Sequence, residues 1–189
     1  MQGQYRGFST FLSEQSPNHI HVWCYAHILN LVLADTTGSV VESASLFSLL
    51  NDIAVFPRES YKRMRKWEEI SKDKHHRRLC PIGQTMWWAK DQALSKGFGC
   101  FGNPQGALFL EVLMTLHTIV DDRTQQPTVR AKAKGFIEGL LRYETVLTAQ
   151  TFLRIFEQTS PLSKYLQTRG MDIITAQRLV EGREEGLRE

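Results

Sequence analysis

The sequence predicts a mainly α-helical chain that opens with a short α/β piece. From Gly38 onward, apolar residues recur at steps of three and four, which is the spacing of one helix face. Proline and glycine separate these stretches at intervals that suit helices. Residues 20–23 (Ile-His-Val-Trp) differ, because their composition favours a strand, and an apolar helical pattern over 24–36 follows directly.

Composition places the chain among folded domains without a membrane-spanning segment. The 189 residues are 42% hydrophobic and 23% charged, which is close to the average for globular proteins. No stretch reaches the roughly 18 continuous apolar residues of a membrane helix, so we expect no membrane partner. Three cysteines, Cys24, Cys80 and Cys100, cannot form a closed disulfide framework, which favours a reducing compartment.

The N-terminal residues 1–18 are polar and predict only one short packed turn or helix, around Phe8, Phe11 and Leu12. We expect that the chain begins inside a larger unit. In the helix over 24–36, Ile28, Leu31 and Val32 fall on one side.

The first long helix after Gly38 is predicted from its ends and its apolar stripe. Ser39-Val40-Val41-Glu42 has the spacing of a capping box. The stripe that follows consists of Leu46, Leu49, Leu50 and Ile53. Pro57 ends this helix and begins another that runs to about Ser71. Residues 72–84 are predicted to form an exposed connection.

Further helices are predicted over 84–96 and 145–157, and other helices are predicted to begin at Asn103-Pro104, Pro127, Ser160-Pro161 and Asp172. The apolar residues expected on one face of these helices include Leu108, Phe109, Val112, Leu113, Leu116, Ile119, Phe136, Ile137, Leu140, Leu141, Val146, Leu147, Phe152, Leu153 and Phe156. Residues 181–189 are charged and are predicted to fray.

Positive charge is concentrated in one segment. Between Arg58 and Arg78 the sequence has nine lysines or arginines and four acids, a net charge of +5, whereas the whole chain carries +3. A local basic surface is what contact with nucleic-acid phosphates requires. The candidate DNA-contacting residues are Arg58, Lys62, Arg63, Arg65 and Lys66. The alternative is an ordinary solvated helix face.

Trp87 and Trp88 are adjacent, so on a helix their side chains point about 100° apart and only one is easily buried. Trp87 is therefore a further candidate, which could stack on a base. Burial of both rings, each from a different side, is the alternative.

Cys24 and His27 have the spacing of half a zinc site. His76 and Cys80 could supply the other half, but about fifty residues separate the halves, so we expect no zinc there. A packed thiol beside a hydrogen-bonded imidazole is the simpler interpretation. A catalytic Cys-His pair is not expected either, because no oxyanion donor or third orienting group can be named. Cys24 and His27 are therefore treated as a structural motif, with no metal and no cofactor.

These residues carry a resemblance to a known family. Residues 24–35 (CYAHILNLVLAD) resemble the Cys-x-x-His block of hAT-superfamily transposases, and residues 5–8 (YRGF) precede it as in that family. Residues 46–50 (LFSLL) and 84–91 (QTMWWAKD) are similar to the blocks that follow. The likeness covers residues 1–179 and is strongest to the domesticated transposase domains of MYM-type zinc-finger proteins.

The resemblance implies a fold and a division of the chain. Residues 1–36, with the strand 20–23 and the helix 24–36, would be the C-terminal piece of an RNase H-like α/β core. Residues 37–180 would be an all-helical insertion domain, and residues 181–189 a charged tail. The resemblance also implies a nuclear location.

The family cuts and joins DNA with three acidic residues and divalent metal. The resemblance places the second acid just ahead of Met1 and the first further upstream, so at least two of the three are absent. Met86-Trp87 also replaces the family's Arg-Trp pair, which removes a phosphate-binding guanidinium. We therefore expect a non-catalytic fragment that binds DNA through its basic helix. The alternative is a protein-interaction or assembly module, including a homo-oligomer, without nucleic-acid binding.

Overall fold

The structure, a computed structural model, describes residues 8–16, 25–71, 79–82, 87–168 and 170–188. It is mainly α-helical, as predicted, and its described residues contain no β-strand and no RNase H-like sheet. The predicted strand over 20–23 lies outside the described residues. The elements are α1 (Phe8–Gln15), α2 (Tyr25–Ser39), α3 (Val41–Val55), the 3₁₀ turn η1 (Phe56–Glu59), α4 (Tyr61–Ile70), α5 (Trp87–Phe98), α6 (Phe109–Asp121), α7 (Pro127–Leu140), α8 (Tyr143–Leu166) and α9 (Ile173–Arg188).

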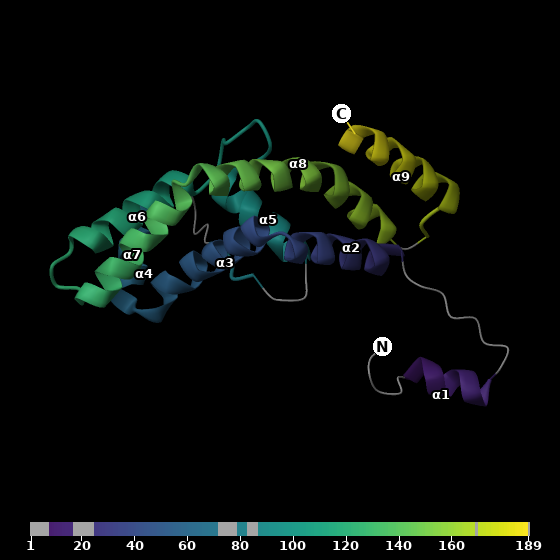
Figure 1. Ribbon diagram of the computed structural model, residues 1–189, viewed down its shortest axis with the longest axis horizontal. Coiled ribbons are helices and arrows are strands. Elements are labelled where there is room, and N and C mark those ends of the chain that lie inside the picture. Colours follow the sequence, from purple (N-terminus) through teal and green to yellow (C-terminus); the bar gives the residue numbers. More distant parts are fainter. Residues whose placement is uncertain (1–7, 17–24, 72–78, 83–86, 169, 189) are drawn as a thin grey trace.

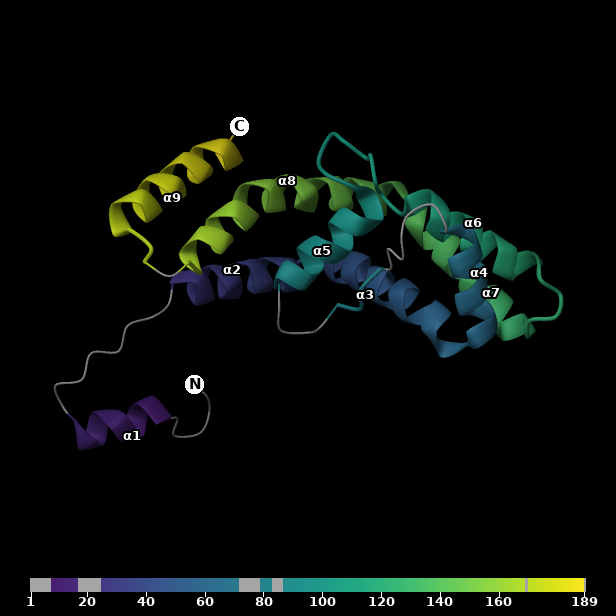
Figure 2. The same ribbon diagram turned by 180° about the vertical axis from the view of Figure 1, so that it is seen from behind.

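The helices form an elongated body, and different helices lie at its two ends. The long helix α8 lies along α2 and α3, and α5 packs against the same group (Figure 1). One end of the body holds α4, α6 and α7, while α9 packs on α8 at the other end. Helix α1 stands apart from this body in both views (Figures 1 and 2).

The core is centred on the contact between α3 and α8. Leu46, Leu50 and Ile53 of the predicted stripe are buried, and Leu49 is partly buried. Phe47, which the stripe did not include, is also buried, and its ring meets that of Phe152 edge-on at 5.4 Å. Aromatic pairs in this geometry add to the stabilisation from burial alone. The i, i+3, i+4 pattern of α3 thus identified the correct face.

A second part of the core joins η1 to α6 and α7. Phe56 is fully buried, and its ring lies 5.3 Å from that of Phe136. Among the residues predicted on the apolar faces, Val146 and Leu147 of α8 are exposed instead, and Phe109 and Leu113 of α6 are only partly buried. The others predicted from α6 and α7 are buried, with the exception of Leu141. Leu141 is the C-cap of α7, where the chain turns toward α8, and it is exposed.

The predicted helix start at Ser160-Pro161 is wrong, because α8 continues through Pro161 to Leu166. Proline removes one hydrogen bond from a helix interior and tends to bend it, and α8 curves along its length in Figure 1. Residues on both sides of Pro161, Phe156 and Leu162, are buried, so packing against other helices extends past the proline. Tertiary packing therefore overrides the local helix-breaking tendency.

The capping box at 39–42 is also wrong. Ser39 belongs to α2, where its hydroxyl donates to the carbonyl of Thr36 at 3.1 Å, and α3 begins after Val40 without a side-chain cap. The corner between α2 and α3 is fixed by Ser43 instead, whose buried hydroxyl donates to the carbonyl of Thr37 at 2.7 Å.

The helix start predicted at Asp172 is confirmed, since α9 begins at Ile173. The Asp172 carboxylate accepts from the backbone amide of Thr175 at 2.8 Å and from its hydroxyl at 2.6 Å. Both bonds favour the charged carboxylate, so the pKa of Asp172 lies below its ordinary value, with the hydroxyl of Thr175 as the first cause. Gly170, at φ +76°, provides the turn before this cap. Helix α9 then continues through the predicted charged tail as far as Arg188.

Two connections differ from their predictions. Asn103-Pro104 does not begin a helix, since α6 starts at Phe109 and the Asn103 side chain caps a turn by accepting from the amide of Gln105. Gly99 enters this turn at φ +88°, and a Cβ there would lie 2.7 Å from the carbonyl oxygen of Asn103. In the connection predicted over 72–84, Leu79 is buried in the core rather than exposed.

Candidate functional site

Helix α4 carries most of the basic residues predicted to contact DNA, but Arg63 does not face solvent. Its residue surface is 7% exposed, and its guanidinium lies 4.2 Å above the centre of the Phe56 ring. Its Nη2 also forms an ion pair with Glu59 at 3.2 Å. Arg63 therefore stabilises the joint between η1 and α4, and it is not placed to contact a phosphate.

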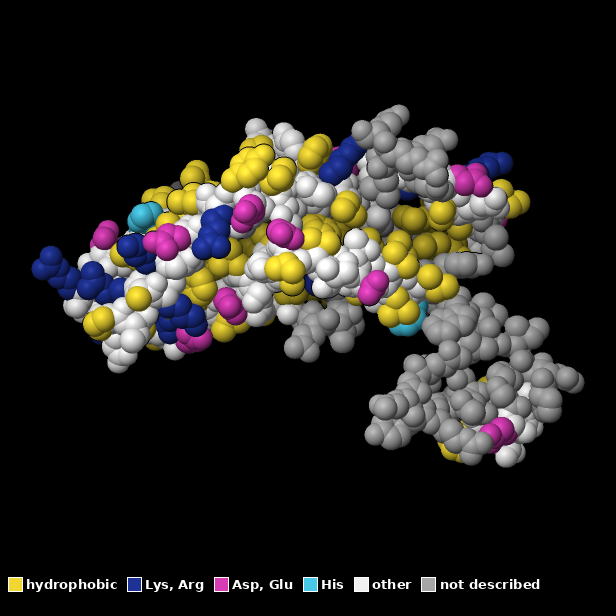
Figure 3. Space-filling view, viewed as in Figure 1, with side chains coloured by type: hydrophobic (Ala, Val, Ile, Leu, Met, Phe, Trp, Pro, Cys, Tyr) yellow, Lys and Arg dark blue, Asp and Glu magenta, His cyan; other side chains and the backbone are white. Residues whose placement is uncertain are grey.

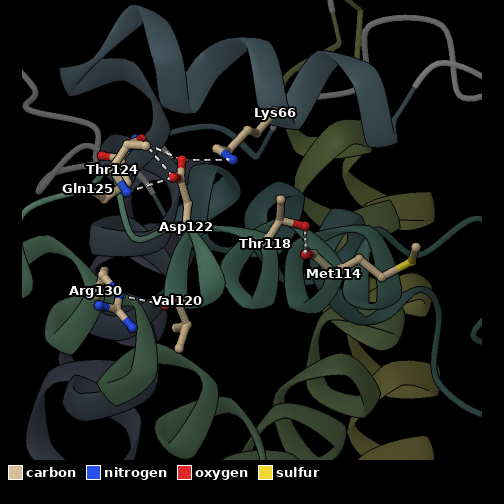
Figure 4. A network of polar contacts seen from close by, with 8 residues as sticks. All are labelled: Lys66, Met114, Thr118, Val120, Asp122, Thr124, Gln125 and Arg130. Atoms are coloured by element: carbon tan, nitrogen blue, oxygen red, sulfur yellow. Dashed lines mark hydrogen bonds and ion pairs between the residues drawn. The ribbon is translucent and has the colours of Figure 1, made fainter.

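Lys66 is similarly engaged within the protein. Its Nζ lies 3.1 Å from Oδ2 of Asp122, which follows α6, as Figure 4 shows. The hydroxyl and amide of Thr124 donate to the same carboxylate. These bonds place the pKa of Asp122 far below its ordinary value, with Thr124 the first cause and Lys66 the next. The Asp122 carboxylate thus stays charged at neutral pH, and its ion pair with Lys66 ties α4 to the α6–α7 connection.

A residue of α7, Arg130, also stabilises the connection between α6 and α7. Arg130 donates from Nε to the carbonyl of Val120 at 2.6 Å (Figure 4). The contacts of Asp122 and Arg130 thus join α4, α6 and α7. Lys66 takes part in them and so contacts the protein itself rather than solvent.

The other three cations of the predicted surface are more accessible. Arg58 is exposed but donates from Nη2 to the carbonyl of Leu79 at 3.1 Å. Arg65 forms an exposed ion pair with Glu69 at 3.3 Å. Lys62 is exposed, and within the described residues it forms no hydrogen bond or ion pair. The candidate DNA surface therefore reduces to Lys62 and Arg65, with Arg58 at its edge.

The tryptophan pair lies at the start of α5. The side chain of Trp87 is outside the described residues, so the prediction for it is not tested, while Trp88 is exposed. One turn further, Lys90 donates to the Thr37 hydroxyl and lies 5.0 Å from the centre of the Phe47 ring. Partial burial lowers the pKa of Lys90. Lys90 thus connects α5 to α2 and α3.

The four residues weighed as zinc ligands are not seen together. Cys24 and His76 lie outside the described residues, and His27 is exposed on the first turn of α2. Cys80 is half-buried, and its sulfur accepts from Nζ of Lys96 at 3.0 Å. In the part of the chain that the structure describes, no three His, Cys, Asp or Glu side chains gather as a metal site requires.

An apolar groove of about 500 Å³ lies at the end of the body where α2, α8 and α9 meet. We call it the α2/α8/α9 groove. Its lining residues are Ile28, Leu29, Val32, Leu162, Leu166, Met171, Ala176, Gln177 and Val180. Figure 3 shows hydrophobic side chains gathered at this end of the molecule. All lining residues except Gln177 are apolar.

Two features position the walls of the groove. Helix α9 is started by the Asp172 cap, and it is held against α8 by buried Ala176 and by a 2.9 Å hydrogen bond from Arg183 to the Gln158 side chain. On α2, the side of the helix predicted to be apolar remains exposed, with Val32 at 56%. Sequence reasoning identified that apolar side but not the groove, because it could not place α9 beside α2.

No protein-family model matches the chain, and no curated protein or solved structure matches it significantly. Among the described residues, no single helix is long and apolar enough to cross a membrane. Two consecutive helical segments, Ala26–Ser39 and Val41–Glu59, are long and apolar enough for a membrane span only when taken together. The chain bends by 98° between them.

Proposed function

We propose that this chain is a protein-interaction module whose α2/α8/α9 groove binds one amphipathic helix. The observation that carries the proposal is an apolar, open groove built by three helices. Monomeric proteins rarely leave large connected apolar surfaces open unless they bind a partner. The polar contacts of Arg63 and Lys66, which remove them from the basic surface, favour this function over DNA binding.

The spacing of the lining residues supports a helix as the partner. Each wall contributes a pair four residues apart, namely Ile28 with Val32, Leu162 with Leu166, and Ala176 with Val180. Such pairs form strips that run along their helices, so the groove offers an elongated apolar trough. A helix that presents residues at i, i+3, i+4 and i+7 is the partner that such troughs accept. Complete burial of each apolar anchor would contribute about 1.5–3 kcal/mol.

Binding of a model helix tests this proposal. The probe is a fluorescent peptide of about 18 residues with leucines at i, i+3, i+4 and i+7 and Ala, Lys and Glu elsewhere. We expect fluorescence anisotropy to show binding with a Kd on the order of 10 µM. Val32→Glu and Val180→Glu should each weaken it by about 10-fold or more, because a carboxylate would enter the apolar trough.

Val41 offers a matched control, since it is 75% exposed on α3 and does not line the groove. Val41→Glu introduces the same charge and should leave peptide affinity unchanged. Equal affinities for the wild-type chain and both groove variants would rule the groove out as the binding site.

A second candidate function is DNA binding by a non-catalytic, transposase-derived nuclear protein. In this proposal residues 1–36 are the end of an RNase H-like core, with residues 20–23 as a strand, and the chain does not cut DNA. The observation that favours it is the outward position of Lys62 and of Arg65, whose side chain is 62% exposed. Exposed cations on one helix can contact phosphates without base recognition.

Salt dependence tests this second candidate. We expect duplex DNA to bind at about 50 mM salt and to weaken steeply toward 200 mM. Replacing Lys62 and Arg65 together with Ala removes two cations, so the slope of log K against log salt should fall by about 2. Lys164→Ala, an exposed lysine on α8, serves as the control and should have little effect. Absence of binding at the lower salt would exclude this function.

A further inference from the structure

Two acidic side chains border the α2/α8/α9 groove. On α2, Asp35 follows the lining residues Ile28 and Val32 at i, i+4 and i+7, so it continues their strip along the same side of the helix. On α9, the carboxylate of Glu181 accepts a 2.9 Å hydrogen bond from Nε2 of Gln177, the polar residue of the groove lining. Both acidic residues are exposed. Two of the three helices thus place a negative charge at the edge of the apolar trough.

Lysine and arginine side chains near the groove lie on other faces of their helices. Lys164 is two positions from each lining residue of α8, and Arg178 is two positions from Val180 on α9. Two positions turn a helix by about 200°, so both cations lie on nearly the opposite side from those lining residues. Arg183 of α9 is engaged with the side chain of Gln158 on α8. Among the described residues, the edge of the groove is therefore acidic, although the whole chain carries +3.

Neither carboxylate is neutralised within the part of the chain that the structure describes. Asp35 forms no hydrogen bond or ion pair there, and Glu181 forms no ion pair. Helices α2 and α9 both begin at the outer end of the body (Figures 1 and 2), and each acid follows the lining residues along its helix. A helix in the groove would therefore meet both carboxylates with the same end of its apolar stripe.

We propose that the α2/α8/α9 groove selects a basic amphipathic helix, with lysine or arginine beside one end of its apolar stripe, and that Asp35 and Glu181 make this selection. The proposal rests on the proposed function of the groove as a helix-binding site and adds the chemistry of the partner. The apolar lining gives affinity for any amphipathic helix, whereas the two carboxylates discriminate between partners. Charges at an exposed rim act mainly on specificity and on the rate of association.

Three versions of the leucine peptide test this selection by fluorescence anisotropy. They differ only in the two residues that flank each end of the apolar stripe, which are Lys, Gln or Glu. At about 50 mM salt we expect the Lys version to bind about 10-fold more tightly than the Glu version, with the Gln version between them, because each exposed charge pair contributes only modestly. At about 500 mM salt the ratio should fall below about 3-fold, since salt screens exposed charges.

Replacing Asp35 with Asn and Glu181 with Gln in one variant tests the two carboxylates directly. The three affinities should then agree to within about 2-fold, because no charge remains at these positions to pair with the peptide. The Gln version should bind this variant as it binds the wild-type chain, which shows that the groove is intact. Both residues are exposed and both replacements keep the size of the side chain, so the variant should fold.

Asp121→Asn combined with Glu144→Gln is the matched control, since it removes the same amount of charge. Asp121 ends α6 and Glu144 lies in the first turn of α8; both are exposed, and neither lines the groove. The preference for the Lys version should therefore remain at about 10-fold in this variant.

The outcomes separate this proposal from the helix-binding function. Groove-dependent binding with equal affinities for the three peptides, or with a preference for Glu, would overturn the selection and leave the helix-binding function intact. No binding of any peptide would remove both. A preference for Lys that survives the loss of Asp35 and Glu181, or that disappears equally in the control, would assign it to charges elsewhere on the chain and would also overturn the proposal.

Discussion

Phe156→Ala is expected to reduce the free energy of unfolding by about 3–5 kcal/mol, the usual cost of deleting a buried aromatic side chain. Phe156 is 2% exposed, and its ring lies 5.9 Å from that of Phe152 and 6.5 Å from that of Phe47. Truncation would remove one ring of this three-ring cluster and leave a cavity between α3 and α8. Chemical denaturation followed by circular dichroism measures the change directly.

Phe101 provides the matched control for this substitution. It is an exposed phenylalanine whose ring receives the guanidinium of Arg154 at 5.5 Å. An exposed cation–π contact is worth about 0.5–1 kcal/mol, so Phe101→Ala should cost no more than that. Equal losses for the two variants would mean that the α3–α8 contact is not the main core.

The α3–α8 cluster also shows what could be predicted from the sequence. Helical spacing marked Leu46, Leu50 and Ile53 as one face, and that face is buried. Local patterns sufficed because an amphipathic helix in a small domain has only one way to hide its apolar side. The cap at Asp172 was predictable for a similar reason, since its bonds reach only two to three residues ahead.

The predictions of helix ends that proved wrong lie where contacts between residues distant in the sequence determine the structure. The sequence predicts a helix start at Pro161, yet residues on both sides of it are buried and α8 continues through it. Ser39 is not a cap, because α2 and α3 follow each other so closely that it belongs to the last turn of α2. Local sequence signals identify helix ends only where no long-range contact competes with them.

For the candidate sites too, local patterns could be predicted from the sequence, whereas long-range contacts could not. A count of charges identified the basic segment, but it could not show that Arg63 lies against Phe56 or that Lys66 reaches Asp122, fifty-six positions away in the chain. The groove was missed because its walls come from α2, α8 and α9, which sequence reasoning could not bring together. The predicted strand over 20–23, Cys24 and His76 lie outside the described residues, so those predictions stand untested.

Arg63→Glu is expected to destabilise the protein by about 3 kcal/mol or more, because it places a carboxylate without a partner at a position that is only 7% exposed. The new carboxylate would face Glu59, whose Oε2 now lies 3.2 Å from the arginine, and it would lie near the face of the Phe56 ring. A ring face is electronegative, so it attracts a guanidinium and repels a carboxylate. The midpoint of urea denaturation should therefore fall strongly.

Lys62→Glu introduces the same charge reversal one position earlier, at an exposed residue with no ion pair to lose within the described structure. Surface changes of this kind usually alter stability by no more than about 0.5 kcal/mol. The two variants therefore separate an effect on folding from an effect on binding. A loss of DNA affinity in Lys62→Glu would indicate a lost phosphate contact. A loss in Arg63→Glu would indicate unfolding. If Arg63→Glu proved as stable as Lys62→Glu, the guanidinium would have to lie in solvent, and the basic surface of α4 would again include it.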